Sequence, residues 1–233
     1  MSAVVFDLDG VLVESEPYWQ RAFAETANAW LDAAGSTRPR FDDADMTRFE
    51  GGRVNETLGE ILDEVRAEID DPGVGGDAFL DRATSVVVGR VAADFAASPQ
   101  TIAASVDVAR QLHARGTRLA VASSSSEMFI DTALHVIGLD DAFAVRRSAL
   151  NLEHGKPDPQ VYLDAADALG ERPEDCVAIE DSSRGIAAAV AAHIPCLGLW
   201  RGEGDPPAAF EACSHVTREL TVDDVDVVLE RKR

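Results

Sequence analysis

Short apolar runs recur along the chain, and polar residues follow them directly. Each run has the length and the unbroken hydrophobicity of a strand that is buried on both faces of a sheet. Stretches with helical periodicity lie between the runs, as at 104–115 and 159–170. Strand and helix in alternation predict an α/β fold with a doubly wound, Rossmann-like parallel sheet. The runs are SAVVF (2–6), RLAVA (118–122), CVAI (176–179) and IPCLGLW (194–200).

Residues 17–96 interrupt this alternation. Their pattern is mostly helical, and the segment after the first strand is longer than one crossover helix requires. We therefore expect an inserted helical cap domain at 17–96 and a sheet core formed by 1–16 and 97–233. The connections ESEP (14–17) and AASPQ (96–100) are expected to be hinges on which the cap rocks over the core.

The composition is that of a globular protein. Apolar residues make up 46% of the 233 residues, yet no apolar run approaches the roughly 20 residues of a membrane span. The N-terminal apolar run has no basic region before it, so we expect no signal peptide. The cysteines are odd in number and lack motif spacing. We expect reduced, mostly buried thiols of a cytoplasmic protein at Cys176, Cys196 and Cys213.

The charge of the chain is strongly negative. There are 42 acidic and 21 basic residues, which gives a formal net charge of −21. Nucleic acids and anionic membranes bind basic patches, so neither is an expected partner. A small anion would be repelled at long range, so any anion site needs a positive charge of its own. The acidic excess fits either adaptation to high salt or a coding bias that favours acidic residues. The expected oligomeric state is a monomer or weak homo-oligomer.

Three of the predicted strands end in polar residues of complementary chemistry. Because the carboxyl ends of parallel strands meet at one edge of a sheet, we expect these residues to share a site with Lys156. That lysine lies in a loop that Gly155, Pro157 and Pro159 shape. Four acids in one cleft need a cation, and Mg²⁺ prefers oxygen ligands. The strand-end residues are Asp7 and Asp9, Ser123 and Ser124, and Glu180 and Asp181.

Each of these signals also has a plainer structural explanation. The two aspartates after the first strand could form a turn, and the acids at 180–181 could begin an ordinary helix. The serines could belong to a loop, and Ser125 and Ser126 are expected to cap the helix that follows them. The order of the signals, each at a strand or loop end, favours one shared site.

The same stretches resemble the four motifs of the haloacid dehalogenase superfamily of phosphatases and phosphomutases. FDLDGVLVESE (6–16) is similar to the first motif, DxDGxLxDS, and AIEDSSRGIAAAVAA (178–192) to the fourth, EDSxxGxxAAxAAG. Ser123 in AVASSSS resembles the second motif, and Lys156 in HGKPDPQVY the third. The inserted segment resembles the helical cap of the subgroup that contains sugar-phosphate phosphatases and β-phosphoglucomutase. Two positions depart from the pattern, a glycine replaced by His193 and a Pro-Gly pair replaced near Ala103-Ala104.

The resemblance implies a role for each residue of the site. Asp7 would be the nucleophile that forms an aspartyl-phosphate, and Asp9 the general acid and then the general base. Mg²⁺ would be held by the carboxylates of Asp7 and Asp181 and by the backbone carbonyl of Asp9, with Glu180 on a metal-bound water. The phosphoryl group would be held by Lys156 and by Ser123 with help from Ser124.

Hydrolysis and phosphoryl transfer share these core residues, so the cap must distinguish them. SEPYWQRAF (15–23) resembles the SEPLW stretch of hexose- and deoxyhexose-phosphate phosphatases, and Trp19 stands where the mutase has a histidine. Arg53 lies within a residue of a cap arginine of the mutase, which makes it a candidate substrate contact. Plainer roles are open for both, since Trp19 could pack at the hinge and Arg53 could be a solvated arginine at a helix start.

The predicted function is a Mg²⁺-dependent phosphatase that hydrolyses a small sugar or polyol phosphate through an aspartyl-phosphate. A mutase of the β-phosphoglucomutase type is the alternative. A phosphoacceptor signalling domain and a non-catalytic binding protein are the further alternatives, although signalling domains of that kind are shorter and have no helical insertion.

Overall fold

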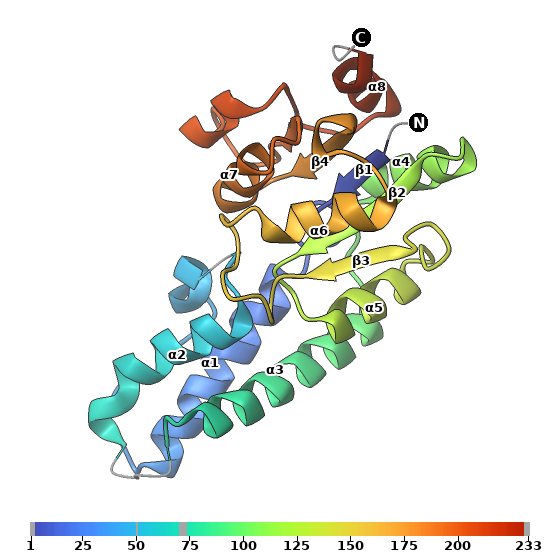
Figure 1. Cartoon of the computed structure of the whole chain (residues 1–233). Helices are drawn as coiled ribbons and strands as arrows, with labels where there is room; N and C mark the ends of the chain where they lie inside the picture. Colours follow the sequence, from blue (N-terminus) through green and yellow to red (C-terminus); the bar gives the residue numbers. More distant parts are fainter. Residues whose placement is uncertain (1–2, 50, 70–73, 231–233) are drawn as a thin grey trace.

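A six-stranded parallel sheet forms the centre of the molecule (Figure 1). The computed structural model describes residues 3–49, 51–69 and 74–230. The strand order is β3-β2-β1-β4-β5-β6, with every neighbouring pair parallel, so the predicted doubly wound α/β fold is confirmed. The strands are β1 (Ala3–Phe6), β2 (Arg118–Ser123), β3 (Val145–Ser148), β4 (Cys176–Glu180), β5 (Cys196–Leu199) and β6 (His215–Thr217).

Helices cover both faces of the sheet, which explains the unbroken apolar runs of its central strands. Along β1, Val4 and Phe6 face one hydrophobic cluster, while Ala3 and Val5 face another. The first cluster includes α4 (Ala103–Ala114), α5 (Glu127–Val136) and α8 (Val222–Glu230), and the second includes α6 (Gln160–Leu169) and α7 (Ser183–Ala191). The three cysteines are free, and two of them are fully buried, as expected.

The inserted segment is helical. Its helices lie together beyond one end of the sheet in Figure 1, and α3 packs against α5 of the core. Phe95 of α3 and Trp19 of α1 both contact Phe129 edge to face, with ring centroids 5.6 and 5.3 Å away. The segment comprises α1 (Glu16–Ala33), α2 (Val54–Val65) and α3 (Asp77–Ala97), with 3₁₀ turns at Ala44–Phe49 and Arg66–Glu68.

The two connections between this segment and the core run side by side. The Glu14 amide donates to the Gln100 carbonyl at 3.0 Å, and the Ile102 amide donates to the Leu12 carbonyl at 3.0 Å. The helices of the segment begin at residue 16 and end at 97, within one residue of the predicted boundaries. A separate domain that moves on these connections stays a prediction. Residues 50 and 70–73 of the predicted cap, and 1–2 and 231–233 of the predicted core, lie outside the described residues.

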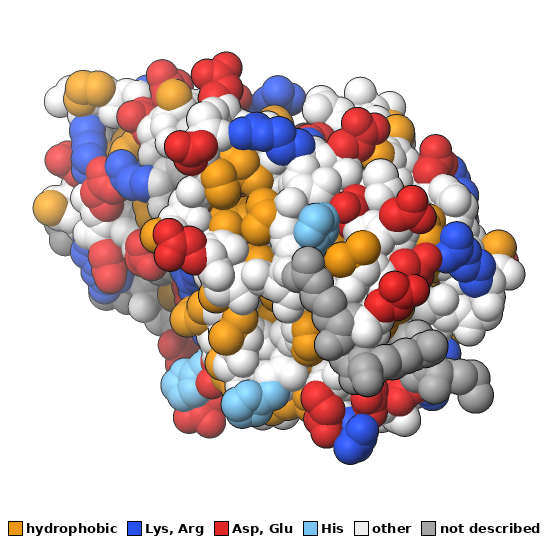
Figure 2. Space-filling model, turned by 90° about the horizontal axis from the view of Figure 1, so that it is seen from above, with side chains coloured by type: hydrophobic (Ala, Val, Ile, Leu, Met, Phe, Trp, Pro, Cys, Tyr) orange, Lys and Arg blue, Asp and Glu red, His pale blue; other side chains and the backbone are white. Residues whose placement is uncertain are grey.

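Acidic side chains are spread over the whole face shown in Figure 2, in keeping with the net charge of −21. Among the described residues, no helix combines the length and the apolar character that crossing a membrane requires.

The C-terminal end of α7 contains a strained residue. His193 has φ +59°, and the amides of His193 and Ile194 donate to the carbonyls of Val190 and Ala189, both at 3.0 Å. This is the hydrogen-bond pattern of a Schellman motif, in which the left-handed position favours glycine. The resembled motif has glycine here, so the departure at His193 carries a conformational cost.

Replacing His193 by glycine is therefore expected to raise the free energy of unfolding by about 1 kcal/mol, because glycine adopts this conformation without a Cβ clash. Urea denaturation of the two proteins measures the difference. The control is Ala192→Gly, where φ is −75° and glycine should lower stability. Equal or lower stability of the His193→Gly protein would contradict the assignment of strain.

Candidate active site

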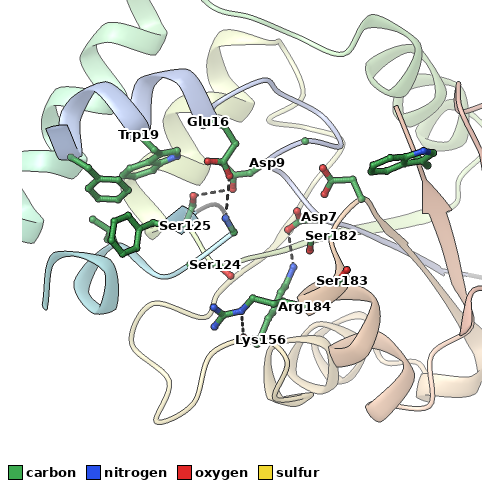
Figure 3. A pocket seen from close by; sticks show the side chains of 18 residues that line it. Asp7, Asp9, Glu16, Trp19, Ser124, Ser125, Lys156, Ser182, Ser183 and Arg184 are labelled. Carbon is green, nitrogen blue, oxygen red and sulfur yellow. Dashed lines mark hydrogen bonds and ion pairs between the residues drawn. The ribbon is translucent and has the colours of Figure 1, made fainter. Parts of the chain in front are cut away.

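The carboxyl ends of β1, β2 and β4 meet at one edge of the sheet, and a cavity of about 410 Å³ opens there (Figure 3). Loops of the core and helices of the inserted segment both contribute to its walls. The core residues that line it include Asp7, Asp9, Gly10, Ser124, Ser125, Lys156, Asp181, Ser182, Ser183, Arg184 and Trp200. The inserted segment contributes Glu16, Trp19, Phe23, Phe49, Gly51, Gly52 and Val54.

Lys156 lies buried at the base of the cavity and joins two carboxylates. Its Nζ is 2.8 Å from Asp7 Oδ1 and 2.6 Å from Glu180 Oε1, and it also donates to the Ala122 carbonyl at 2.9 Å. The Tyr162 hydroxyl donates to the same Glu180 oxygen at 2.5 Å. Burial alone would lower the pKa of Lys156, but the charges of Asp7 and Glu180 raise it above its ordinary value. The lysine therefore stays charged.

Three carboxylates lie close together around Lys156. Asp7, Glu180 and Asp181 each place an oxygen within 4.8 Å of the others. Burial raises the pKa of Asp7 well above its usual value, Lys156 lowers it, and neighbouring acids raise it further. Burial and then the charge of Glu180 raise the pKa of Asp181 in the same way. Both pKa values are raised first because burial takes the carboxylates out of water and then because neighbouring acids repel their charge, and a bound cation would offset both effects.

The donors fit a hard divalent ion such as Mg²⁺, which takes carboxylate and carbonyl oxygens. Gly10 makes room for them, because a Cβ at this residue would lie 1.8 Å from Asp181 Oδ2. Gly10 also has φ +78°, so its backbone turns the chain back toward the site. Glu180 has hydrogen bonds on both oxygens, since Ser182 Oγ donates to Oε2 at 3.2 Å. Glu180 is therefore placed to hold a ligand of the metal and not to bind the metal itself.

The Glu180 side chain depends on a glycine in the next helix. A Cβ at Gly185 would lie 1.9 to 2.0 Å from all three atoms of the Glu180 carboxylate. Replacing Gly185 by alanine is expected to displace Glu180 from Lys156 and to lower kcat/KM by about 10²-fold, because small displacements of catalytic groups are costly. Assays of phosphate release together with thermal unfolding measure this.

Gly89 provides a matched control for that substitution. It also lies in a helix, α3, but a Cβ there meets no atom within 4 Å. Gly89→Ala should leave kcat/KM unchanged and should stabilise the fold by about 0.5–1 kcal/mol, since alanine favours helix. If Gly185→Ala behaves like Gly89→Ala, the proposed dependence of Glu180 on this glycine is wrong.

Asp9 is held by three hydroxyl groups. Ser123 Oγ and Ser125 Oγ both donate to Asp9 Oδ2 at 2.9 Å, and Ser15 Oγ donates to Oδ1. Ser123 is fully buried behind Asp9, whereas Ser124 lines the cavity. The expected capping role is confirmed for Ser126, which accepts from the Phe129 amide. It is wrong for Ser125, because the turn after β2 points this hydroxyl toward Asp9.

Trp19 and Arg53, the two cap residues predicted to contact the substrate, occupy different environments in the structure. Trp19 lines the cavity and also packs within the segment, stacked on Phe23 with ring centroids 6.1 Å apart. Arg53 is buried, so the alternative of a solvated arginine is wrong. It is absent from the cavity wall, although Gly52 and Val54 on either side line it. Its guanidinium points instead to the carbonyls of Ala149 and Leu152 in the core.

Sequence analysis missed several residues of the site. Ser15 and Glu16 end the first motif, and a polar pair at the start of a helix gave no separate signal. Arg184 lines the cavity and occupies a variable position of the fourth motif. The requirement that an anion site carries its own positive charge could have pointed to it. Tyr162 lies on the apolar face of α6, where an aromatic residue is ordinarily core.

Comparison with known proteins agrees with this geometry. The sequence matches the family of haloacid dehalogenase-like hydrolases over residues 1–193. The chain belongs to this family. It is 32% identical to hexitol phosphatase B of Escherichia coli K12 over 196 residues, which covers 82% of this chain and 80% of that protein. It is 27% identical to β-phosphoglucomutase of Bacillus subtilis, with 96% and 93% of the two chains covered.

The fold of this family member also matches a solved structure. The crystal structure of β-phosphoglucomutase from Clostridium difficile superposes with a TM-score of 0.80 and covers 99% of this chain and 98% of that one. The sequence identity is 19%, so this likeness shows the fold alone. The chain is thus a haloacid dehalogenase-like hydrolase, with phosphatases of sugar or polyol phosphates and a phosphosugar mutase among its distant relatives.

Proposed function

We propose that this protein is a Mg²⁺-dependent phosphatase that hydrolyses a small sugar or polyol phosphate through an aspartyl-phosphate on Asp7. The observation that carries the proposal is the buried ion pair of Lys156 and Asp7, with Nζ and Oδ1 2.8 Å apart. It lies at the base of a cavity whose other end reaches the helical segment. A carboxylate so placed can attack phosphorus while the lysine neutralises the phosphoryl oxygens.

The chain's own groups account for both halves of the reaction. Asp7 attacks phosphorus, the bond from phosphorus to the ester oxygen breaks, and Asp9 gives its proton to the departing oxygen. Asp9 then takes a proton from a water that attacks the aspartyl-phosphate, and the bond to Asp7 breaks to release phosphate. The hydroxyls of Ser15 and Ser125 orient Asp9 for these two transfers.

Other groups hold the phosphoryl group and the metal. Lys156 and Ser124 would contact the phosphoryl oxygens, and Ser123 would contribute once it turns from Asp9. The carboxylates of Asp7 and Asp181 and the carbonyl of Asp9 would hold Mg²⁺, with Glu180 supporting a bound water. When bound, the ion would supply the positive charge that the phosphoryl group and the surrounding carboxylates need.

The walls of the cavity favour a phosphatase over a mutase. A mutase must bind a second phosphate, which requires basic groups facing the substrate. Among the described residues, the helical segment contributes aromatic rings and Glu16 to the cavity but no lysine or arginine. Arg53 is directed into the core, and Arg184 comes from α7 and lies 4.0 Å from Glu56. Trp19 and Phe23 offer apolar surface against which the carbon skeleton of a sugar or polyol can lie.

The proposal extends to the organisation and setting of the enzyme. Residues 17–96 would form the cap domain, and residues 1–16 and 97–233 the catalytic core. The cap would move on 14–17 and 96–100 to admit the substrate and then exclude water. The three free cysteines suit a cytoplasmic enzyme. We propose a monomer or weak homo-oligomer whose partner is a small phosphorylated metabolite.

The test is phosphate release from a panel of sugar and polyol phosphates, measured with Mg²⁺ and again with a chelator. The proposal requires Mg²⁺-dependent release that is concentrated on one or two hexose, pentose or hexitol phosphates. Conversion of β-glucose 1-phosphate to glucose 6-phosphate after addition of a bisphosphate, without net release, would show a mutase. A stable phosphoprotein after acetyl phosphate treatment, without turnover, would indicate a phosphoacceptor domain.

A further inference from the structure

Arg53 forms a buried contact between the helical segment and the loop that carries Lys156. It immediately precedes α2, and its side chain is 9% exposed. Nη1 donates to the carbonyl of Leu152 at 2.6 Å and to that of Ala149 at 3.3 Å. In Figure 1 this loop, which follows β3, runs down beside the N-terminal end of α2. The contact thus joins two parts of the molecule about a hundred residues apart in sequence.

The glycine before Lys156 is explained by the same contact. Gly155 is not among the residues with positive φ, so its backbone conformation does not require glycine. A Cβ at Gly155 would instead lie 2.7 Å from both Cδ and Nε of Arg53. These atoms are in the middle of a side chain whose end is fixed by two carbonyls, so they cannot move aside without breaking those hydrogen bonds. Gly155 and Arg53 therefore fit as a pair.

Lys156 is also held from its other side. The carbonyl of Lys156 accepts a hydrogen bond from Arg184 Nε at 2.9 Å. Arg184 Nη2 lies 4.0 Å from Glu56, which pairs with Arg53 Nη2 at 2.5 Å. Arg53, Glu56 and Arg184 thus form a row of alternating charges. Its two ends donate to backbone carbonyls of the same loop, at Leu152 and at Lys156.

Fold stability alone does not account for this arrangement. Arg53 Nε is buried and has no hydrogen-bond partner among the described residues. Burying a charged group with an unsatisfied N–H is costly, and an apolar side chain of similar volume usually serves a core at least as well. Such costs are characteristic of functional sites.

We propose that Arg53 is a positioning residue that fixes the 149–156 loop so that Lys156 reaches Asp7. Through the same hydrogen bonds it ties the helical segment to this loop. When the helical segment docks over the cavity, the same hydrogen bonds therefore also place Lys156. The expected change in turnover rests on the proposed function, whereas the expected change in the loop does not.

The test combines kinetics with amide hydrogen exchange. Arg53→Ala, Gly155→Ala and the double variant are compared with wild type, using p-nitrophenyl phosphate with Mg²⁺ as substrate and inorganic phosphate as inhibitor. The control is Arg90→Ala, an arginine of the same segment that pairs with Glu25 on the surface. Assays are run at a temperature at which circular dichroism shows every variant folded. Exchange is followed over residues 149–158 without substrate.

Arg53→Ala is expected to lower kcat by about 10–10²-fold, to raise the inhibition constant of phosphate and to speed exchange in the loop, because misplaced catalytic groups lose that much rate. Gly155→Ala alone should cause a similar loss. In the Arg53→Ala background it should cost no more than about twofold, because the pair no longer collides. A purely structural Arg53 would lower the melting temperature without this coupling.

Additive losses, or an Arg53→Ala protein that matches Arg90→Ala in kcat, phosphate inhibition and loop exchange, would overturn the inference. A wild type that releases no phosphate from any ester would reject the proposed function instead. In that case amide hydrogen exchange in the loop alone tests the role of Arg53. Faster exchange in Arg53→Ala supports the inference, and unchanged exchange overturns it.

Discussion

Replacing Asp7 by asparagine is expected to lower kcat by about four orders of magnitude or more, the scale seen when a nucleophile is removed. Asparagine has nearly the shape of aspartate, but its amide cannot form the aspartyl-phosphate. It also removes one of the two carboxylates, those of Asp7 and Asp181, that would bind the metal. Phosphate release at saturating substrate, with wild type at the same Mg²⁺ concentration, gives the ratio.

Asp107→Asn is the control for this substitution, because Asp107 lies exposed on α4 and pairs with Arg110. That variant should keep wild-type kcat. The Asp7→Asn protein should also bind Mg²⁺ more weakly, which titration calorimetry measures. An Asp7→Asn protein with more than about a hundredth of the wild-type kcat would mean that another group receives the phosphoryl group.

Replacing Lys156 by methionine is expected to have the second large effect, on both activity and stability. It would leave Asp7 and Glu180 buried without their cation, and breaking a buried ion pair from one side costs about 3–5 kcal/mol. The loss of charge at the phosphoryl oxygens should lower kcat by about 10³-fold or more. Urea denaturation in the presence of a chelator and steady-state assays with Mg²⁺ measure the two effects.

Lys156→Arg separates the charge from the shape of this group. Lys156 Nζ makes short contacts with Asp7, Glu180 and a carbonyl inside a closed space, which a wide guanidinium cannot reproduce. We expect the arginine variant to lose most activity too. The exposed Arg172→Lys is the reciprocal control and should be unchanged. Full activity of Lys156→Arg would show that only the charge matters.

The strands that sequence analysis identified are the ones buried on both faces. The β1 residues Ala3–Phe6 are fully buried, and such a run is read directly from the sequence. Strands β3 (VRRS) and β6 (HVT) were missed because they lie at the two edges of the sheet, where partial exposure admits arginine and histidine. An edge strand therefore lacks the unbroken apolar run by which the central strands are recognised.

The core of the site was predictable because each residue follows a strand or lies in a short motif. Asp7, Glu180 and Asp181 meet because parallel register aligns the ends of β1 and β4. The contribution of the helical segment was not predictable in this way. Whether Arg53 faces the cavity or the loop at 149–155 is decided by tertiary packing, and the helical pattern around it is the same in either case.

The serines after β2 illustrate the limit of local patterns. Four consecutive serines offer the same chemistry, yet the structure uses them in three different ways. Ser123 and Ser125 donate to Asp9, Ser124 lines the cavity and Ser126 caps α5. The backbone turn between a strand and a helix sets these directions, and the sequence alone does not specify the turn.

The central claim is that the phosphoryl group passes through Asp7. The most direct measurement is the intact mass of the enzyme, quenched with acid during turnover of its best substrate with Mg²⁺, followed by peptide mapping. The account predicts a fraction of wild-type protein that carries one added phosphoryl group on Asp7, and none in the Asp7→Asn protein. Steady phosphate release by an enzyme that is never phosphorylated, or a phosphoryl group on another residue, would contradict it.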